Sequence, residues 1–470
     1  MPGYGAAVPR LRHRSAMHSS LSLLLLLSAC SGDKIGAGDS ADPAAALPDL
    51  ALSVTLSDVI PTVATATWSL DSDDVVVNAA WVEFGRDGSF DTRVAVDLSA
   101  GSPVATPLLG MKPDTTYGVR VVADTDLGTV TSDAVDVTTG PVSPDLPGTT
   151  VEVGDADAMH RGFYVTSIVA ASTAVILDSD GDYVWWYTLE GVDRLGRVRL
   201  SRDRSSVWMA TINLDGEEDV DIVRVSVDGS TEEHISTPRR HHDFVELSDG
   251  TLVYTAEDPT DVGAVTVAGD IVVERAPDGS TREVYRVLDH HEPFSGSTNG
   301  GPRWPHANAI DAIDDESAYL VSFLYMNGIA RIDRATGDET WFLGGGESDF
   351  HRSDGSSDYT DYQHGIELLG DRLLIFDNGH SAHSSRAVEV AFDTGTMLAE
   401  EAWEYRPDPE LDTVTMGDVH RFADGNTLVT FSYNGVIEEV DPSGDGVWRL
   451  STDIGGALSW LDFYDRLQPE

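Results

Sequence analysis

Cysteine and lysine are nearly absent from this sequence. Cys30 is the one cysteine in 470 residues, which excludes an intramolecular disulfide, and it leaves the body of the chain without a thiolate metal site or a cysteine nucleophile. The lysines, Lys34 and Lys112, both precede residue 150. Schiff-base chemistry and a phosphate-binding lysine loop are therefore excluded from the long C-terminal part. A nucleophile there must be a histidine, serine, threonine, tyrosine or carboxylate.

Positive charge is also scarce. The chain has 30 Lys and Arg against 80 Asp and Glu, a formal net charge of -50 at pH 7. Proteins that bind nucleic acid present basic faces, and anionic membrane surfaces attract basic segments, so this balance argues against both partners. Such acidity reports solubility or a saline habitat rather than a site. At this length two domains with separate cores are expected.

The N-terminal residues have a different composition. Arginines precede the short apolar run "LSLLLLL", and "LSAC" ends at Cys30. We expect residues 1–29 to be a lipoprotein signal peptide, because the apolar run is too short to span a bilayer and a small-residue cleavage site follows it. "LSAC" is similar to a bacterial lipobox, whose cysteine becomes the lipidated N-terminus; an ordinary signal peptide with an incidental cysteine is the alternative. Residues 30–46 then form a flexible tether, and the expected location is periplasmic or cell-surface, at the outer membrane.

A first β-domain is expected over residues 47–142. Runs such as "ATATWSL", "AAWVEFG" and "TYGVRVVADT" alternate between apolar and polar residues, which is typical of half-buried strands separated by turns. The segment "MKPDTTYGVRVVA" resembles part of a fibronectin type III module. We therefore expect a small fibronectin III- or Ig-like β-sandwich, whose role stays open between docking, homodimer formation and spacing.

Repeats dominate residues 150–470. A polar turn followed by an aromatic residue recurs in "DSDGDYVWWY", "RATGDETWF" and "DPSGDGVWRL", and apolar strands such as "TLVYTA" and "RLLIFD" lie between these turns. Asp and Gly supply hairpin turns, and four short strands per repeat are typical of propeller blades. The prediction is an all-β protein with a six-bladed β-propeller behind the sandwich. The repeats start near Tyr164, Val198, His242, His306, His364 and Gly417.

The segment "DSDGD" offers alternating carboxylates, as a calcium loop does. It lacks the glycine at the sixth position and the distal glutamate of that motif. We therefore predict a hairpin turn here.

Histidines recur at one phase of the repeat. His242 in "HHDFVEL", His306 in "PHANAIDAI" and His364 in "QHGIELL" each precede an apolar strand, and Gly417 in "MGDVHRF" holds this place in the last repeat. The innermost strand of each blade lines the central channel, so the three histidines are predicted to share one small volume near the axis. Capping of blade-end loops and a three-histidine metal site are the alternatives; the metal site has the weakness that Asp243 is the one carboxylate close in sequence.

Three imidazoles in one volume suit the transfer of an anionic group. A neutral imidazole is a nucleophile and a protonated one is an acid, so histidine can serve both halves of a transfer. A sulfuryl or phosphoryl group also needs positive or hydrogen-bonding groups around its oxygens. The remaining histidines and Asn308 would supply them.

The repeat region resembles one known family, the bacterial arylsulfate sulfotransferases. The resemblance runs from "RHHDFVELSDGTLVY" to "MGDVHRFADGNTLVTFSYNGVIEEVDPSGDGVW" and includes "HANAID", "GIARIDRATGDETWFLGG", "YQHGIELL" and "FDNG". It implies a six-bladed propeller behind an N-terminal β-domain, and transfer of a sulfuryl group from a phenolic sulfate ester to another phenol through a sulfohistidine. By motif, His364 matches the family's nucleophile. The residues that match those holding the sulfuryl group and assisting the leaving oxygen are His242, His306 and Asn308.

One position departs from the family pattern. Where the family has a sulfate-binding arginine after the "HANAID" strand, this chain has "LVSFLYMNG", with Leu324 at the matching position. The missing bidentate contact is worth about 2 kcal/mol of transition-state stabilisation. Arg386 in "SSRAVEV" and Arg303 just before His306 are candidates to replace it, although Arg386 also fits a role on the blade surface. The loss of the arginine equally fits an altered donor or a propeller that no longer catalyses.

The sequence thus predicts an exported aryl sulfotransferase that acts on a small-molecule aryl sulfate and a phenol. No cofactor is expected, because no Gly-rich loop followed by a helix is present to hold a nucleotide sulfate donor. The membrane is expected to be contacted only through a lipid on Cys30. Two other functions stay open: a non-catalytic propeller that binds a sulfated or phenolic ligand, and a metal-dependent hydrolase that uses the three histidines.

Overall fold

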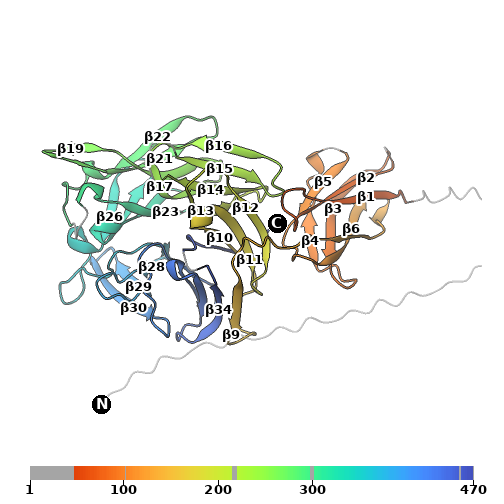
Figure 1. The fold of residues 1–470 in the computed structure, drawn as a ribbon. Coiled ribbons are helices and arrows are strands. Elements are labelled where there is room, and N and C mark those ends of the chain that lie inside the picture. Colours follow the sequence, from red (N-terminus) through yellow and green to blue (C-terminus); the bar gives the residue numbers. More distant parts are fainter. Residues whose placement is uncertain are drawn as a thin grey trace, which may run out of the picture. The chain divides into compact units, whose positions relative to one another are not determined.

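The structure is a computed structural model that describes residues 47–468, apart from residues 73, 101, 214–219, 297–300 and 455–456 (Figure 1). The predicted signal peptide, Cys30 and the predicted tether lie outside the described residues. In the described part of the chain every regular element is a β-strand or a short 3₁₀ turn, and no helix is long and apolar enough to cross a membrane. The 3₁₀ turns are η1 (Leu98–Ala100), η2 (Val169–Ala171), η4 (Val287–Asp289), η5 (Gly301–Arg303), η6 (Leu324–Met326), η7 (Gly345–Glu347) and η8 (Ser432–Asn434).

Two antiparallel sheets form the N-terminal part of this region. One consists of β1 (Leu50–Leu56), β2 (Ala64–Leu70) and β5 (Val104–Leu108). The other consists of β3 (Val77–Gly85), β4 (Thr92–Ala95), β6 (Thr116–Thr125), β7 (Gly128–Thr131) and β8 (Val135–Thr138). Alternate residues of β2 and β3, among them Trp68 and Phe84, are buried in one core shared by both sheets. The likeness to a fibronectin III module stays a prediction.

The rest of the described chain forms six antiparallel sheets of four or five strands, the blades of an all-β propeller, as predicted. The first blade contains β10 (Phe163–Ile168), β11 (Thr173–Asp178), β12 (Tyr183–Thr188) and β35 (Asp462–Tyr464). The second contains β13 (Arg194–Leu200), β14 (Ser206–Ile212), β15 (Asp221–Ser226) and β16 (Glu232–Ser236). The third contains β17 (Arg240–Glu246), β18 (Leu252–Glu257), β21 (Asp270–Arg275) and β22 (Thr281–Arg286), with the hairpin β19 (Thr260–Val262) and β20 (Val265–Val267) inserted.

The last three blades follow the same plan. The fourth contains β23 (Ala307–Ile313), β24 (Ala318–Phe323), β25 (Gly328–Asp333) and β26 (Glu339–Leu343). The fifth contains β27 (Ile366–Leu368), β28 (Arg372–Asp377), β29 (Arg386–Asp393) and β30 (Leu398–Tyr405). The sixth contains β31 (Asp418–Arg421), β32 (Thr427–Phe431), β33 (Val436–Val440) and β34 (Gly446–Thr452), and β9 (Thr149–Val153) is its fifth strand.

Strands from both ends of the region close the propeller. β9 pairs with β34 at the outer edge of the sixth blade, and β35 pairs with β10 as the innermost strand of the first blade. The first repeat therefore begins near Tyr164 with its second strand, because its inner strand comes from the far end of the propeller sequence. Sequence periodicity within one repeat could not show this exchange.

The inner strands surround a cavity of about 250 Å³. Each of the six inner strands, or the residue just before it, contributes one residue to a ring around this cavity, so the cavity lies on the propeller axis. The ring consists of Arg197, Asp243, Ala309, Gly365, Asp418 and Asp462. The residue two positions further along most of these strands also lines the cavity: Arg199, Asp311, Glu367, His420 and Tyr464. This alternation is that of extended strands and gives each inner strand a fixed register relative to the axis.

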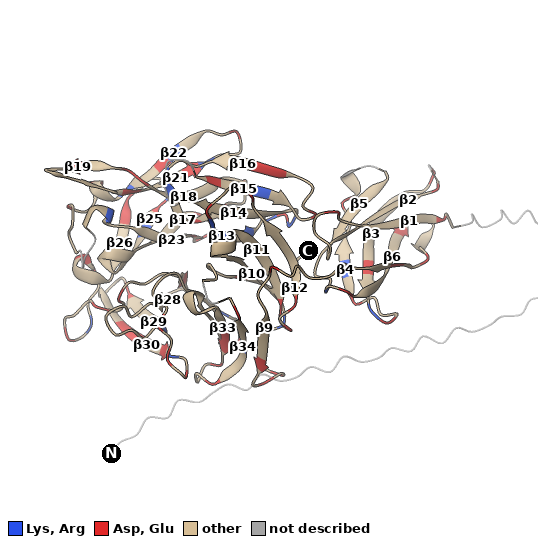
Figure 2. Cartoon of the chain, in the orientation of Figure 1, with Lys and Arg blue, Asp and Glu red and all other residues tan. Residues whose placement is uncertain are grey.

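The charges have a wide distribution. Acidic residues are spread over the N-terminal sheets and the blades rather than gathered on one element (Figure 2). The "DSDGD" segment is the turn between β11 and β12, as predicted, and its Asp178, Asp180 and Asp182 contact Lys112 Nζ at 2.9, 2.8 and 2.6 Å. One of the few lysines is therefore used to neutralise this acidic turn.

Candidate active site

The predicted histidines come together at one end of the axial cavity. The rings of His242 and His306 lie 4.5 Å apart, nearly perpendicular to each other. Trp460, which also lines the cavity, lies 5.9 Å from the ring of His242 and 6.4 Å from that of His364. His364 is close enough to both other histidines for its charge to lower the pKa of each. We call His242, His306 and His364 the histidine cluster.

One histidine of the cluster, His306, does not occupy the repeat position that the sequence predicts for it. The residues immediately before the ring members Asp243, Gly365 and Asp418 are His242, His364 and Gly417, as the repeat predicts. In the fourth blade this place belongs to Asn308, because Ala309 is the ring member there. His306 lies two residues earlier and reaches the cluster from a different backbone position. The repeated sequence pattern matches His306 with His242 and His364, whereas the residues that line the cavity show that Asn308 has the corresponding backbone position.

Unusual backbone geometry helps to direct two of these side chains. His242 and His306 have φ angles of 61° and 64°, in the left-handed region that is uncommon for residues other than glycine. The pairing of β17 with β18 and of β23 with β24 shifts register next to these residues, as in a β-bulge. Bulges re-aim side chains and are frequent beside active sites. Positive φ angles in residues other than glycine are found most often at active sites and ligand-binding sites.

The proton on His364 has a defined position. His364 Nδ1 lies 2.7 Å from Asn378 Oδ1, and Asn378 Nδ2 donates to the carbonyl oxygens of Thr413 and Met416 at 2.6 and 2.9 Å. Those two carbonyls fix the orientation of the amide, so its Oδ1 faces the imidazole and can only accept a hydrogen bond. His364 therefore carries its proton on Nδ1 and has an unprotonated Nε2. This is the nitrogen that can act as a nucleophile.

Burial keeps His364 uncharged. The residue is 3% exposed, and burial lowers the pKa of its imidazole to about 4, although the hydrogen bond that it donates to Asn378 opposes this shift. Its chain segment is held in place by the preceding residue. Gln363 is fully buried, its Nε2 donates to Ser322 Oγ and to two backbone carbonyls, and its own carbonyl accepts from Asn308 Nδ2 at 2.7 Å.

The other two imidazoles are also uncharged at neutral pH. Burial, reinforced by neighbouring imidazoles, lowers the pKa of His242 and of His306 well below its usual value. Both residues are half-buried, in contrast to His364. The three side chains therefore do not repel an anionic substrate. Protonation of one of them is opposed by burial and by the neighbouring imidazoles.

Asn308 lies beside the segment that carries His364. Besides the bond from its Nδ2 to the carbonyl of Gln363, its Oδ1 is buried and has no hydrogen-bond partner among the described residues. The amide therefore positions the segment that carries His364 and retains an unused acceptor. A buried polar atom without a partner invites a ligand group.

The structure contradicts the substrate-binding role predicted for Arg386. All five N–H donors of its guanidinium are engaged by Asp377, Glu401, Glu404 and the carbonyl of Tyr359. Its side chain is 12% exposed on β29, and no donor is left for a sulfate oxygen. The alternative role, an ion-pair residue of the blade, is the one observed.

Arg303 and Leu324 both lie next to His306. Arg303 is exposed at the end of η5 and is close enough to help lower the pKa of His306. The N–H of Leu324 donates to the carbonyl of His306 at 2.9 Å, and its side chain is buried. The position predicted to match the family arginine is thus next to His306, and it holds an apolar side chain. Arg303 is the cation that remains close to His306.

Aromatic side chains extend away from the cluster. Tyr325 lies 5.4 Å from His306, Tyr362 lies 5.7 Å from Tyr325, and His380 stacks on Tyr362 at 4.6 Å. The two tyrosines are half-buried and His380 is exposed. Together with Trp460 these rings offer faces against which an aromatic ligand can pack.

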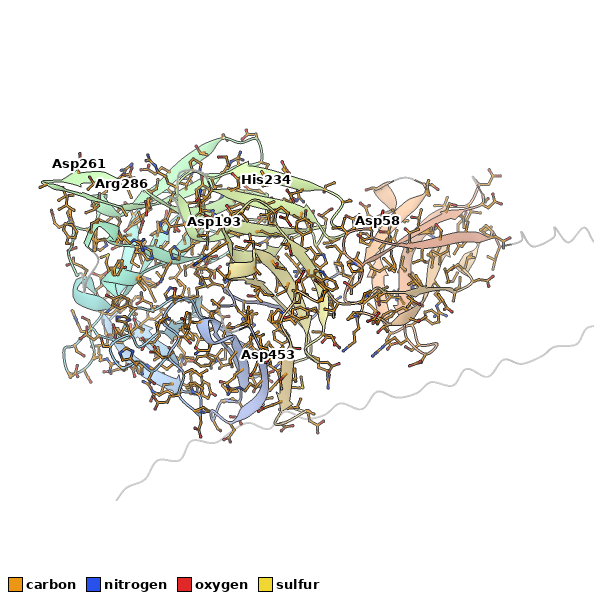
Figure 3. The ribbon with its side chains drawn as sticks, viewed as in Figure 1. Asp58, Asp193, His234, Asp261, Arg286 and Asp453 are labelled. Carbon is orange, nitrogen blue, oxygen red and sulfur yellow. The ribbon has the colours of Figure 1, made fainter. Side chains whose placement is uncertain are left out.

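Sequence reasoning missed four residues at this site: His241, Asp270, Asn378 and Trp460. Asn378 belongs to the "FDNG" motif, which directly follows the strand paired with the His364 segment, so its position gave a signal. Asp270 lies on the third strand of its blade, far in sequence from His241, and gave none. His234, labelled in Figure 3, lies on β16 outside this cluster. Its Nδ1 is 2.8 Å from Asp221 Oδ2 and its Nε2 is 3.0 Å from Glu232 Oε1.

The part of the chain that the structure describes contains no set of side chains arranged as metal ligands. No group of three or more His, Cys, Asp or Glu side chains there is arranged to hold a metal ion. The cluster instead combines one imidazole whose Nε2 is unprotonated with two neutral imidazoles beside it. Such a set can form a covalent bond to an electrophile and can give or take a proton at the departing oxygen.

Comparison with known structures gives only distant similarities. A protein of unknown function from Bacteroides caccae is 13% identical, with 64% of this chain and 98% of that chain covered and a TM-score of 0.43. A streptogramin B lyase is 14% identical, with 65% and 98% covered and a TM-score of 0.39, and the virginiamycin B lyase from Staphylococcus aureus is 14% identical, with 65% and 99% covered and a TM-score of 0.36. No protein with a curated description matches the chain.

A family comparison is decisive. The sequence model described as arylsulfotransferase (ASST) matches residues 149–452, which run from the first residue of β9 to the last residue of β34. This range covers more than half of the chain and includes the whole histidine cluster. The chain belongs to the arylsulfotransferase family.

Proposed function

We propose that this protein transfers a sulfuryl group from an aryl sulfate to a phenol through a covalent intermediate on His364, with no nucleotide sulfate donor. The observation that supports this most directly is the tautomer of His364, which Asn378 sets with Nε2 unprotonated. A buried and uncharged imidazole in that tautomer needs no separate base before it attacks.

The reaction has two half-steps. In the first, a bond forms between His364 Nε2 and the sulfur of the aryl sulfate, the bond from sulfur to the aryl oxygen breaks, and that oxygen takes a proton from His242 or His306. In the second, the oxygen of the acceptor phenol attacks the sulfur, the N–S bond breaks, and the phenol proton returns to the same imidazole. One proton thus cycles in the cluster while the sulfuryl group moves. Arg303 and the second N–H of Asn308 Nδ2 would donate hydrogen bonds to the transferred group.

The setting of the reaction is also a proposal. Export, with a lipid on Cys30 holding the protein to the outer membrane at the periplasmic or cell surface, agrees with the pattern of the N-terminal residues. A reaction without a nucleotide sulfate donor fits such a location, because no nucleotide has to be supplied there.

Release of phenol from a chromogenic aryl sulfate, with and without an acceptor phenol, tests the function. We expect release to depend on the acceptor and to be unaffected by a chelator. Acceptor-independent release that a chelator abolishes would establish a metal-dependent hydrolase instead. Ligand binding without release would establish a binding propeller.

The nucleophile is tested by trapping. Incubation with donor alone should add the mass of one sulfuryl group to the intact protein, and peptide mapping should place it on His364. His364→Asn should abolish both the adduct and the transfer, a loss of at least about a thousandfold. The control is His234→Asn on the outer strand β16, which should leave both unchanged. Full transfer by the His364→Asn protein would remove this residue from the mechanism.

A further inference from the structure

A fourth histidine, His241, is buried next to His242 of the cluster. His241 is 5% exposed, and its Nδ1 lies 2.8 Å from Nδ1 of His242. Its Nε2 lies 3.0 Å from Oδ1 of Asp270, the first residue of β21, which is 2% exposed. The other oxygen of Asp270 accepts from the N–H of Ala307 at 2.5 Å, so this carboxylate is anchored to the residue that follows His306.

The carboxylate of Asp270 determines which atoms donate and which accept along the hydrogen-bonded series Asp270, His241 and His242. Asp270 as a carboxylate only accepts, so His241 must carry a proton on Nε2. Neutral His241 then has an unprotonated Nδ1, which accepts from Nδ1–H of His242. Neutral His242 in turn has an unprotonated Nε2. Asp270 therefore determines, through His241, which nitrogen of His242 can exchange a proton with a substrate.

The same three hydrogen-bonded residues can hold one additional proton. If His242 is protonated on Nε2, its Nδ1 proton can shift to His241, and the positive charge then lies beside the carboxylate of Asp270. Among the residues that the structure describes, the charged and titratable groups that face the pair are Asp270 from β21, Arg240 from β17, and His306 and His364 from the neighbouring blades; Arg303 in turn faces His306. Asp270 is the negative member of this set. It opposes the burial and the neighbouring charges that otherwise keep His242 uncharged.

We propose that His241 and Asp270 are positioning residues that make His242, rather than His306, the proton donor to the departing aryl oxide. This inference rests on the proposed function and adds to it the identity of the acid and its two partners. In the donor half-step the aryl oxygen takes the proton from His242 Nε2 as its bond to sulfur breaks, and the pair returns to the neutral arrangement. In the acceptor half-step the phenol returns that proton to Nε2.

Donors with different leaving groups test the proposal. The probes are phenyl sulfate, whose aryl oxide is a strong base and needs protonation, and nitrophenyl sulfate, whose aryl oxide leaves with little help. For Asp270→Asn and for His241→Asn we expect kcat/KM to fall about 10- to 100-fold with phenyl sulfate and less than about threefold with nitrophenyl sulfate. The alkaline limb of the phenyl sulfate profile, where His242 loses the proton that it donates, should move to lower pH by about one to three units in Asp270→Asn, because the pair is harder to protonate without the carboxylate.

His291→Asn is the matched control. His291 is a buried histidine whose Nε2 lies 3.0 Å from Glu339 Oε2, a pair like His241 and Asp270 but on other elements. This variant should leave the ratio of the two donors unchanged. The two cluster variants differ in what they keep: Asn at position 241 can still accept from His242 Nδ1, whereas Asn at position 270 removes the charge and leaves His241. If one of them fails to fold, the other still decides.

The results distinguish failure of the proposed role of His241 and Asp270 from failure of the proposed sulfuryl transfer. Equal losses with both donors in the folded variants would overturn the role of His241 and Asp270 while leaving the sulfuryl transfer intact. Transfer by wild type from neither donor would overturn the proposed function and this inference with it. Preservation of the nitrophenyl sulfate rate together with loss of the phenyl sulfate rate would establish the pair as partners of the acid.

Discussion

At the residue scale, a single amide determines the chemistry of His364. A carboxylate partner would raise the pKa of this histidine, because negative charge favours the imidazolium. Asn378 is neutral, so it fixes the tautomer without adding a negative charge, and burial lowers the pKa of His364 to about 4 even though the hydrogen bond to Asn378 raises it in part. The nucleophilic form is then fully present at neutral pH. His241 shows the opposite arrangement, since its partner is the carboxylate of Asp270 and its neighbour is an acid in the proposed reaction.

A change of Asn378 to aspartate tests this reasoning. Asn378→Asp keeps an acceptor for Nδ1–H and adds a negative charge, so the pKa of His364 should rise from about 4 by about one to three units. The neutral form is then lost at a higher pH, and the acid limb of sulfohistidine formation moves upward. Single-turnover release of nitrophenol across the acidic and neutral range measures this limb. Asn378→Ser, which adds no charge, should slow the reaction without raising the limb; an unchanged limb in Asn378→Asp would contradict the assignment.

At the element scale, the start of each inner strand is where the repeats diverge. The same backbone position carries His242, Asn308, His364 and Gly417 in four successive blades. At Gly417 the backbone has a φ of 113°, and a Cβ there would lie 2.2 Å from the ring of Phe376. Phe376 lies on β28, the strand whose carbonyl accepts from the N–H of His364. The glycine therefore makes room for the strand that is hydrogen-bonded to His364.

Gly417→Ala should consequently be costly. Both the positive φ and the contact with Phe376 oppose a methyl group, so we expect a loss of about 2–4 kcal/mol in the free energy of unfolding. Gly446→Ala at the start of β34 is the control, because no atom lies within 4 Å of a Cβ at that position; it should change stability by less than about 0.5 kcal/mol. Urea denaturation of both variants measures the difference. Similar losses for the two would show that the close approach at Gly417 relaxes.

The sequence reveals the repeats but not the contacts between them. Turn chemistry and strand alternation predict six blades, and the shared phase of His242 and His364 follows from aligned turns in adjacent strands. The true counterpart of these residues in the fourth blade, Asn308, was hidden because the histidine that repeats the sequence pattern, His306, lies two positions earlier, next to a register shift in the pairing of β23 with β24. Asp270 could not be predicted, since its contact with His241 depends on which strands of a blade become neighbours.

The same limit applies to the arginines. Nothing in "SSRAVEV" shows that five donors of Arg386 will be taken up by carboxylates and a carbonyl from three other segments. Its charge suggested anion binding, but in a chain of net charge -50 acidic partners are abundant. An arginine on a blade is then more often neutralised by its neighbours than left for a ligand.

At the scale of the whole molecule, one arginine connects four blades. Arg197 on β13 contacts Asp418 Oδ2 on β31 at 2.6 Å, Asp462 on β35, and Asp243 on β17 at 3.7 Å. Its side chain is 7% exposed. Because β35 closes the first blade, this guanidinium sits where the first and last parts of the propeller meet. Burial raises the pKa of Asp418, and Arg197 opposes that rise.

Arg197→Met should weaken the whole propeller. Removing the cation leaves buried carboxylates uncompensated, and we expect a loss of about 3–5 kcal/mol in the free energy of unfolding at neutral pH. Arg224→Met, which removes a partly exposed pairing with Asp203, is the control and should cost less than about 1 kcal/mol. Without the cation the pKa values of Asp418 and Asp462 in the folded protein rise above their unfolded values, so the loss should shrink as the pH falls and these groups take up protons. Urea denaturation at neutral and acidic pH measures both effects, and a loss that stayed constant with pH would show that lost packing rather than unpaired charge accounts for it.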